Sequence, residues 1–469
     1  MKNNVGVLLP LGSLPGHHGI GDFGRSSLRF IRWLSNNGFK YWQVLPLNPV
    51  GPGNSPYMST CSFALEDRYI CLDDLVKEGL LEEAPAFSPK ANKIDYQAVL
   101  DYKDEYLYKA FKEFIKKPYR GYKKFKKDNP WLTPYALFMT LRKKNGYVTW
   151  NNWKKKDLKL FNMSRAPKAY KDDIEFIAFK QFIAFRQWNK VRKFAKKLGI
   201  TIIADCPFYV GIDSVDCLLN KEEFMLDEKY NPTVVSGCPP DAFSDDGQLW
   251  GTPIYNFNKM KENGYAFLVE RIASYMKTCD ILRLDHFRAF DTYCVIPAGD
   301  ENARRGKWEI GPRYDFFDAL YKKYPNIKLI AEDLGDLFPS VLELRDHYNL
   351  SGMYIVEFTI FDVKAMSTER QIVYPGTHDN QTLYGWLKSL DEKNLTFIKN
   401  KFAGSEDLYK SVFEYIWNLP SYMTIFQLQD LLMLDDSARI NWPGSVGDPN
   451  WTFKFKDFKW MKDVKFLNI

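Results

Sequence analysis

Ile281-Leu282-Arg283-Leu284-Asp285 decides the fold, because this short apolar strand ends on a carboxylate and directly follows an amphipathic helical pattern over residues 267–276. Leu329-Ile330-Ala331-Glu332-Asp333 repeats the arrangement, and so does Ile200-Thr201-Ile202-Ile203-Ala204-Asp205. Strands that are apolar on both faces and alternate with helices are typical of a buried parallel sheet. The three segments therefore predict an α/β fold with acidic residues at the ends of its strands.

The same alternation extends over most of the chain. A helical pattern over residues 27–37 separates the first two predicted strands. The remaining predicted strands lie at residues 5–9, 41–46, 353–358, 373–379 and 438–442. Eight strands alternating with helices favour a (β/α)8 TIM barrel over an open sheet. We predict such a barrel with large, mainly helical insertions at its C-terminal face and no separate C-terminal β-domain.

Two intervals are too long to be ordinary loops of a barrel. Residues 62–166 are rich in Lys, Tyr and Trp with helical stretches, and they predict an inserted helical subdomain. Residues 208–261 are dense in Gly, Pro, Asp and aromatic residues, and they predict an inserted loop-rich subdomain over the active-site cleft. Residues 1–469 then form a single catalytic barrel that carries both insertions.

The composition argues against an intrinsically disordered chain and against a nucleic-acid-binding protein. Hydrophobic residues make up 45% and charged residues 26% of the 469 residues, as in an ordinary globular chain. The net charge of +7 is mild for this length. Residues 116–127 are strongly basic with interleaved aromatic residues, which fits either nucleic-acid binding or a solvated helical face. With no binding motif beside them, we predict a solvated face and no nucleic-acid partner.

The apolar segments also bear on location. No stretch approaches the roughly 18 apolar residues that span a bilayer, and the N-terminal apolar run is too short for a signal sequence. The seven cysteines show no Cys-x-x-Cys spacing. We predict a cytoplasmic protein with reduced thiols, no membrane partner, and a monomeric or weakly dimeric state.

Four carboxylates at strand ends carry the strongest chemical signal: Asp205, Asp285, Glu332 and Asp379. Like charges that converge at a barrel mouth are costly unless a reaction or a cation requires them. Three interpretations fit the pattern: a glycosidase-like site, structural ion pairs, or a divalent-metal site. Metal is disfavoured because the five histidines form no His-x-x-x-His or His-x-x-Glu-His spacing.

Glycoside chemistry requires three of these carboxylates, each in a different role. One attacks the anomeric carbon, a protonated partner releases the leaving oxygen, and a third negative charge stabilises the oxocarbenium-like transition state. Arg283 lies two residues before Asp285, so both side chains point to the same side of the strand. We expect its guanidinium to keep Asp285 ionised, and His378 to donate to a sugar hydroxyl.

Ordered sequence blocks along nearly the whole chain carry a resemblance. They include residues 6–11, 19–24, 42–47, 55–57, 204–207, 237–241, 250–253, 283–288, 331–335, 376–380 and 441–444, the last being Asn-Trp-Pro-Gly. Together they resemble the 4-α-glucanotransferases (amylomaltases, or disproportionating enzymes), which form glycoside hydrolase family 77 of the α-amylase clan.

The resemblance implies a role for individual residues. Asp285 is implied as nucleophile, Glu332 as general acid/base and Asp379 as transition-state stabiliser. The implied substrate-binding residues are Ser55, Tyr57, Asp205, Asp241, Gln248, Trp250, Arg283, His286, His378, Asn380 and Asn441. Among these, Asp241, Gln248 and Trp250 match a flexible loop over the acceptor side, and for Asn441 a turn or strand-end role stays open.

The implied activity is retaining transfer of an α-1,4-glucan segment to the 4-hydroxyl of glucose or a maltooligosaccharide, through a covalent glycosyl-aspartate. The expected partners are α-1,4-glucans and maltooligosaccharides. No cofactor or metal is expected. A hydrolase with the same three carboxylates is the nearest alternative, followed by a non-catalytic glucan-binding protein.

Overall fold

Eight short parallel strands form the central sheet of the protein, which is presented here as a computed structural model describing residues 4–162, 167–240, 245–335 and 337–464. In spatial order the strands run β10, β11, β12, β1, β2, β3, β6 and β9. Their bounds are β1 Val5–Leu8, β2 Tyr41–Gln43, β3 Thr201–Cys206, β6 Ile281–Leu284, β9 Leu329–Ala331, β10 Met353–Ile355, β11 Ile372–Tyr374 and β12 Met423–Gln427.

The two ends of this sheet meet and close it into a barrel. Ile330 of β9 forms a parallel bridge with Ser351, immediately before β10. The Ala331 N–H donates to the Ser351 carbonyl at 2.9 Å. The predicted (β/α)8 barrel is therefore confirmed, and all the strands end at one mouth.

The inside of the barrel is a packed apolar core. It is filled by the side chains of Leu8, Ile203, Ile281, Ile330, Met353, Ile355, Ile372, Tyr374, Met423 and Ile425. The packing is tight around Gly6 of β1, because a Cβ there would lie 2.5 Å from both Ile425 Cδ1 and Tyr41 Cβ. Such a filled interior is rigid, so it holds the strand ends in fixed positions.

Helices cover the outside of the barrel between the strands. α7 packs on β3, and α10 packs on β3 and β6. Each of the outer helices follows a strand along the chain, α17 after the last strand, β12. Their bounds are α1 Arg25–Asn36, α7 Lys171–Lys197, α10 Ala266–Met276, α11 Arg313–Lys323, α12 Pro339–His347, α13 Val356–Thr359, α14 Leu383–Ser389, α15 Glu392–Lys401, α16 Leu408–Asn418 and α17 Leu428–Leu431.

One strand prediction is wrong. Residues 438–442 are not a strand, because Ala438 ends a short 3-10 helix (Asp436–Ala438) and the next residues form a loop with Ile440 buried. The eighth strand is β12, which was missed. It runs into α17 at Gln427 with no Gly or Pro between them, so no turn residue marks the end of the strand. Ala438 and Ile440 are buried and alternate with polar residues, which is the period of a strand, although neither residue lies in one.

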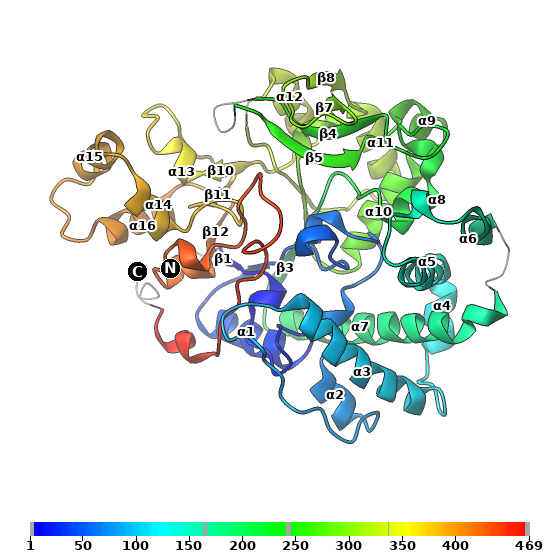
Figure 1. Ribbon diagram of the computed structural model, residues 1–469. Helices are drawn as coiled ribbons and strands as arrows, with labels where there is room; N and C mark the ends of the chain where they lie inside the picture. The colour runs from blue at the N-terminus through cyan, green and yellow to red at the C-terminus, as the bar shows by residue number, and fades with distance from the viewer. Residues whose placement is uncertain (1–3, 163–166, 241–244, 336, 465–469) are drawn as a thin grey trace.

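The described part of the interval 62–166 contains several helices. It holds α2 Leu72–Lys77, α3 Tyr96–Phe114, α4 Tyr122–Asp128, α5 Leu132–Lys144 and α6 Lys155–Leu158. In Figure 1, α2 to α5 lie beside the long helix α7, and α3, α4 and α5 contact it. No helix in the described parts of the chain is long and apolar enough to cross a membrane.

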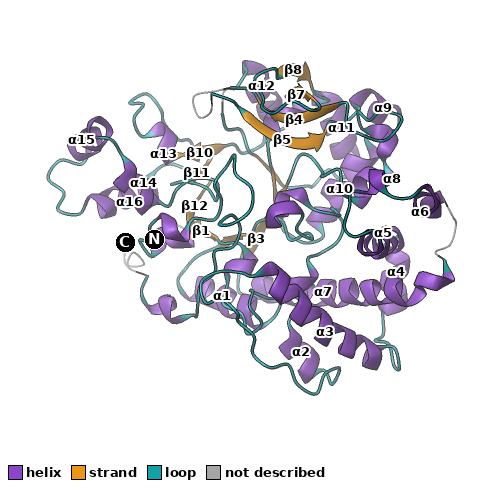
Figure 2. Cartoon of the chain, viewed as in Figure 1, coloured by secondary structure: helices purple, strands orange, loops and turns teal. Residues whose placement is uncertain are grey.

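A second, antiparallel sheet stands apart from the barrel strands (Figure 2). Its order is β5, β4, β7, β8. The strands are β4 Val234–Cys238, β5 Gln248–Pro253, β7 Thr292–Pro297 and β8 Lys307–Ile310, while α8 Val215–Leu219 and α9 Phe257–Glu262 flank β4 and β5 in the chain. The interval 208–261 thus contains regular strands, which pair with a hairpin that follows β6.

Candidate active site

Two neighbouring strands place a charged pair at the barrel mouth. Asp205 of β3 and Arg283 of β6 are register partners, so their side chains project from the same side of the sheet. Arg283 Nη1 donates to Asp205 Oδ2 at 2.6 Å, and both side chains are almost fully buried. The strand pairing itself therefore builds a cationic anchor beneath the mouth.

Arg283 also holds the two carboxylates that follow β6 and β9. Its Nη1 donates to Asp285 Oδ1 at 3.0 Å, and its Nη2 lies 3.7 Å from Glu332 Oε1. Three carboxylates thus surround one guanidinium. One cation does not compensate three carboxylates, of which Asp205 is fully buried and Asp285 and Glu332 keep side-chain exposures of 25% and 17%. Such an arrangement shifts carboxyl pKa values.

Burial raises the pKa of Asp285 to about 7, and repulsion from Asp205 and Asp379 adds to it, against the attraction of Arg283. Arg283 therefore acts in the expected direction, toward ionised Asp285, while the net pKa of Asp285 is raised. Burial and like charges outweigh the one cation at this position.

The pKa of Glu332 is also held well above its usual range, first by burial and then by Asp285 and Asp379. Arg283 opposes both shifts, but it hydrogen-bonds Asp285 and only approaches Glu332. The two carboxyls titrate together, and the closer cation favours ionised Asp285 with the proton on Glu332.

The backbone at His286 adopts a strained conformation that directs its N–H toward Glu332. His286 has φ of 49°, in the left-handed region that non-glycine residues rarely adopt. In this conformation its N–H donates to Glu332 Oε2 at 2.7 Å, while the next N–H, of Phe287, donates to the Glu332 carbonyl at 3.1 Å. Strain of this kind persists where the surroundings enforce it and gathers at functional sites.

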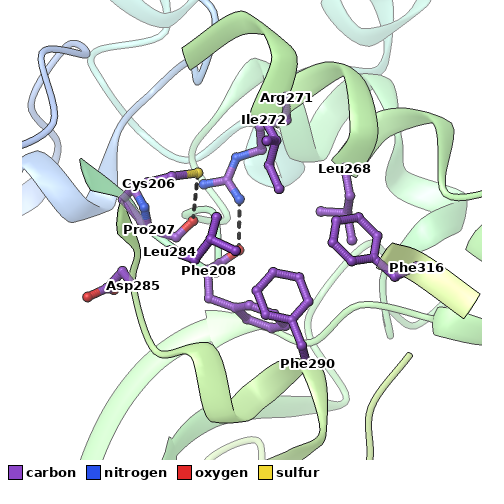
Figure 3. A pocket seen from close by; sticks show the side chains of 10 residues that line it. All are labelled: Cys206, Pro207, Phe208, Leu268, Arg271, Ile272, Leu284, Asp285, Phe290 and Phe316. Atoms are coloured by element: carbon purple, nitrogen blue, oxygen red, sulfur yellow. Dashed lines mark hydrogen bonds between the residues drawn. The ribbon is translucent and has the colours of Figure 1, made fainter. Parts of the chain in front are cut away.

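An apolar pocket with one buried arginine lies behind Asp285 (Figure 3). Its walls include Phe208, Leu268, Phe290 and Phe316. In Figure 3 the Asp285 carboxylate points away from these rings. Asp285 therefore lines this pocket while its carboxylate is directed out of it.

A chain of close polar contacts connects Asp205 to Asp379 across the mouth. Tyr57 Oη donates to Asp205 Oδ2 at 2.8 Å and lies 2.8 Å from His378 Nε2. That Nε2 lies 3.3 Å from Asp379 Oδ2. Burial lowers the pKa of His378, so its ring is neutral. The Tyr57 and His378 rings also stack, with centroids 5.5 Å apart.

Asp379 is held by the loop that follows the 3-10 helix Asp436–Ala438. Asn441 Nδ2 donates to Asp379 Oδ1 at 2.6 Å, and Arg439 Nη2 donates to the Asp379 carbonyl at 2.7 Å. Asn441 thus contacts a carboxylate of the site directly, and no strand end is involved.

The antiparallel sheet presents aromatic surface to the same mouth. Trp250 of β5 meets the His286 ring edge-on, with centroids 4.8 Å apart. Trp250 Nε1 donates to Gln248 Oε1 at 3.2 Å, which fixes the indole. Burial lowers the pKa of His286 to about 3, so this imidazole is neutral too. Asp241 lies outside the described residues.

Two other predicted site residues make local contacts. Ser55 Oγ caps the 3-10 helix Pro56–Met58 by accepting from the Tyr57 N–H at 3.2 Å. Asn380 Oδ1 accepts from the N–H and hydroxyl of Thr377 at 2.9 and 3.0 Å. Ser55 therefore orients Tyr57, and Asn380 shapes the turn that carries His378 and Asp379.

Several buried polar atoms at the mouth have no hydrogen-bond partner within the described residues. They are Asp205 Oδ1, His286 Nε2 and His378 Nδ1. Buried polar atoms are normally satisfied, so unpaired ones at one site indicate groups available to a polar ligand. The described residues contain no group of three or more His, Cys, Asp and Glu side chains arranged to hold a metal ion.

Sequence reasoning missed two residues of this site. Trp451 packs beside Tyr57 and His378, with ring centroids 5.5 and 6.1 Å away. Arg439 contacts the main chain of Asp379. Arg439 precedes the block 441–444 by two residues and Trp451 follows it closely, so their nearness to that block was the available signal.

The closed barrel and its carboxylate cluster define an enzyme of the TIM-barrel class that has a glycosidase-like site. A family model described as 4-alpha-glucanotransferase matches residues 9–460. The 4-alpha-glucanotransferase of Clostridium butyricum is 37% identical over 465 residues, which cover 95% of each chain. The chloroplastic/amyloplastic enzyme of Arabidopsis thaliana is 37% identical over 96% of this chain and 81% of its own.

A solved structure is similar at the level of the whole fold. Amylomaltase from Streptococcus agalactiae, in complex with acarbose, has a TM-score of 0.93 at 32% identity, covering 99% of this chain and 97% of that one. The chain belongs to the 4-alpha-glucanotransferase family, glycoside hydrolase family 77, and is an enzyme of the glycosyltransferase class.

Proposed function

We propose that the protein transfers an α-1,4-glucan segment from a donor to the 4-hydroxyl of glucose or a maltooligosaccharide, with retention of configuration. One observation carries this mechanism: a single guanidinium, that of Arg283, lies 3.0 Å from Asp285 and 3.7 Å from Glu332. A retaining site needs two carboxylates close together, one ionised and one protonated. The closer contact with Arg283 favours this division of the proton.

In the first step Asp285 attacks C1 of the donor sugar, and the glycosidic C1–O bond breaks. Glu332 gives its proton to the departing oxygen, so a shortened glucan leaves with a free 4-hydroxyl. The remaining segment is held as a β-linked ester on Asp285, and Glu332 is left ionised. The His286 N–H, 2.7 Å from Glu332 Oε2, stabilises that ionised form.

Asp379 is assigned to stabilise the positive charge that develops at C1 and the ring oxygen. Its carboxylate is held by Asn441 and lies beside the neutral His378. A preorganised charge costs no reorganisation when the transition state forms. Asp379 therefore acts without taking or giving a proton.

The sugar in the cleaved subsite is assigned to the unpaired polar atoms of the mouth. Asp205 Oδ1, His378 Nδ1 and His286 Nε2 are available to hydroxyl groups. Tyr57 and Trp451 provide flat apolar surface next to them. Sugar rings present hydroxyls at the rim and C–H groups on the face, so they match both kinds of group.

In the second step the acceptor replaces the leaving glucan. Glu332, now a base, takes the proton of the 4-hydroxyl as its oxygen bonds C1 and the Asp285 ester breaks. One α-1,4 bond is broken and one is made. A sugar competes with abundant water through binding energy and orientation, which Trp250, Gln248 and Asp241 are assigned to supply.

Incubation with maltotriose tests the reaction. We expect glucose and longer maltooligosaccharides to appear together while the total concentration of reducing ends stays constant. Reducing ends that rise with product would show that water is the acceptor, so the protein would be a hydrolase. Maltotriose and maltoheptaose both left unchanged would overturn the catalytic assignment and favour a glucan-binding protein.

The same proposal includes the setting of the enzyme. Cys61, Cys71, Cys206, Cys217, Cys279 and Cys294 are free thiols, which suits a reducing compartment and a cytoplasmic enzyme. We assign it a monomeric or weakly dimeric state. Light scattering across a concentration series checks that state, and a concentration-independent mass of a dimer or larger assembly would contradict it.

A further inference from the structure

Arg439 lies where two loops of the barrel mouth are fastened together. The loop after β11 carries His378 and Asp379, and the loop after the 3-10 helix Asp436–Ala438 carries Asn441. Arg439 Nη2 donates to the Asp379 carbonyl at 2.7 Å, and its Nε donates to the Asn441 carbonyl at 2.7 Å. One guanidinium edge therefore holds the main chain of both residues.

Each oxygen of the Asp379 carboxylate has a partner that belongs to one of these loops. Asn441 Nδ2 donates to Oδ1 at 2.6 Å, and His378 Nε2 lies 3.3 Å from Oδ2. Arg439 fixes the carbonyls of Asp379 and Asn441, so it sets where the carboxylate and its strongest hydrogen-bond donor meet. The carboxylate is otherwise open: its side chain is 41% exposed.

The surroundings of Arg439 explain why an arginine stands there. Its charge faces Asp436, Glu357 and Asp379, and its guanidinium packs over the Trp442 ring at 5.3 Å. Asp436 in turn accepts from Gln381 Nε2 at 2.6 Å and from the Thr382 N–H at 3.0 Å. The planar fork of arginine offers two parallel donors, whereas the ammonium of lysine is a compact point charge.

We propose that Arg439 is a positioning residue for Asp379, acting on the transition state through the Asp379 main chain and Asn441. This inference rests on the proposed function, and it assigns Arg439 no contact with the sugar. A stabilising charge works only if it is aimed before the reaction, and a displacement of about 1 Å costs about 100-fold in rate.

Arg439→Lys tests the role because it keeps the charge and removes the fork. We expect kcat for maltotriose transfer to fall about 100-fold with KM within about twofold, because the lost interaction acts in the transition state. Added guanidinium is expected to raise kcat of Arg439→Ala by refilling the site.

Arg192→Lys is the matched control. Arg192 also bonds two main-chain carbonyls, those of Lys277 and Cys279, at 2.7 Å each, but in the loop that enters β6 at the opposite end of the barrel. We expect this variant to lose thermal stability and keep kcat per folded molecule. Guanidinium is expected to leave kcat of Arg192→Ala unchanged.

Fluoride release from α-maltosyl fluoride separates this proposal from the proposed function, because it reports attack by Asp285 without an acceptor. A wild-type protein that releases fluoride but transfers no sugar would overturn the transfer reaction, and Arg439→Lys would still be expected to slow the release.

Three results would overturn the positioning role. They are a kcat of Arg439→Lys within twofold of wild type, a loss that matches the unfolded fraction as for Arg192→Lys, and no response of Arg439→Ala to guanidinium. If Arg439→Lys does not fold, Arg439→Gln with Asn441→Ala gives a double-mutant cycle. Independent, multiplicative losses in kcat would then contradict the proposal.

Discussion

The barrel mouth and the junction of α3 with α7 each bury carboxylates around basic side chains. At the junction, Arg68 donates to both oxygens of Glu66 at 2.7 Å, and Lys180 lies 2.5 Å from Asp67 and 2.9 Å from Asp104. At the mouth, Asp205, Asp285 and Glu332 lie around Arg283. The first cluster has two cations for three carboxylates, one of which, Asp104, is 37% exposed, whereas the second has one cation for three carboxylates.

The pKa shifts of the two clusters run in opposite directions. Burial acts to raise the pKa of Asp67, but the attraction of Lys180 and Arg68 outweighs it, so the pKa is lowered. Burial raises the pKa of Asp285 to about 7 because one shared cation does not compensate it. Buried ions alone therefore do not indicate function. The uncompensated negative charge at the mouth does indicate function, since it contributes nothing to folding stability.

The largest effect is expected from a substitution of Asp285, the carboxylate at the mouth whose pKa is raised. Asp285→Asn removes the nucleophile, so transfer is expected to fall by about 10⁴-fold or more. The same change removes a like charge from the crowded mouth, so the melting temperature is expected to stay equal or rise. Steady-state transfer and thermal unfolding measure the two effects. A variant with near-normal turnover would contradict the assignment of the nucleophile.

Much of this site was predictable because its residues end buried strands. Asp205, Asp285 and Glu332 follow apolar segments whose periodicity is visible in the chain, and the closed barrel brings such ends together. Arg439 was not predictable in this way. It binds main-chain carbonyls, which every residue has, so no side-chain pattern in the sequence announces its partners.

The antiparallel sheet was missed for a related reason. β4 and β5 lie within 208–261, and they pair with β7 and β8 from a hairpin on the far side of β6. Pairing between separate segments leaves no local period, and the Gly and Pro content of the first segment indicated loops. β12 was missed because it has no turn residue before α17.

Asp67→Asn is expected to damage the balanced cluster in the opposite way to Asp285→Asn. Breaking a buried pair leaves Lys180 partly uncompensated, so the free energy of unfolding is expected to fall by about 3 kcal/mol. The kcat of the folded protein is expected to be unchanged. Denaturant unfolding and activity per folded molecule check both parts. A selective loss of kcat at unchanged stability would show that this cluster serves the chemistry.

The pH dependence of stability sharpens the contrast, because the two carboxyls shift in opposite directions. The folded pKa of Asp285 is raised from 3.8 to about 7, so its contribution to stability is present below pH 4 and is lost as pH rises toward 7. The folded pKa of Asp67 is below 3.8, so its contribution is present above that value and is lost as pH falls.

Melting temperatures measured from pH 3 to pH 8 therefore distinguish the variants. Relative to wild type, Asp285→Asn is expected to gain stability between about pH 4 and 7, since it has no carboxyl to ionise there. The deficit of Asp67→Asn is expected to be full at neutral pH and to shrink below about pH 4. Parallel curves for the two variants would remove the distinction between the clusters.

The smallest expected effect concerns the aromatic wall rather than the charges. Trp250 packs edge-on against His286, whose backbone N–H holds Glu332. Trp250→Ala is expected to raise the ratio of hydrolysis to transfer about fivefold, which corresponds to about 1 kcal/mol of lost acceptor binding. Reducing ends and ladder products from maltotriose, followed together, give this ratio, and Trp250→Phe is the graded control.

The change in the ratio of hydrolysis to transfer depends on whether the Trp250 indole contacts the acceptor or supports His286. If Trp250 binds the acceptor, its loss weakens the sugar and leaves water unaffected, so hydrolysis gains relative to transfer while fluoride release from α-maltosyl fluoride holds. If instead Trp250 mainly supports His286 and thereby Glu332, both outcomes slow together and the ratio stays constant. A constant ratio with reduced fluoride release would thus place Trp250 with the carboxylates, as part of the unbalanced cluster that it covers.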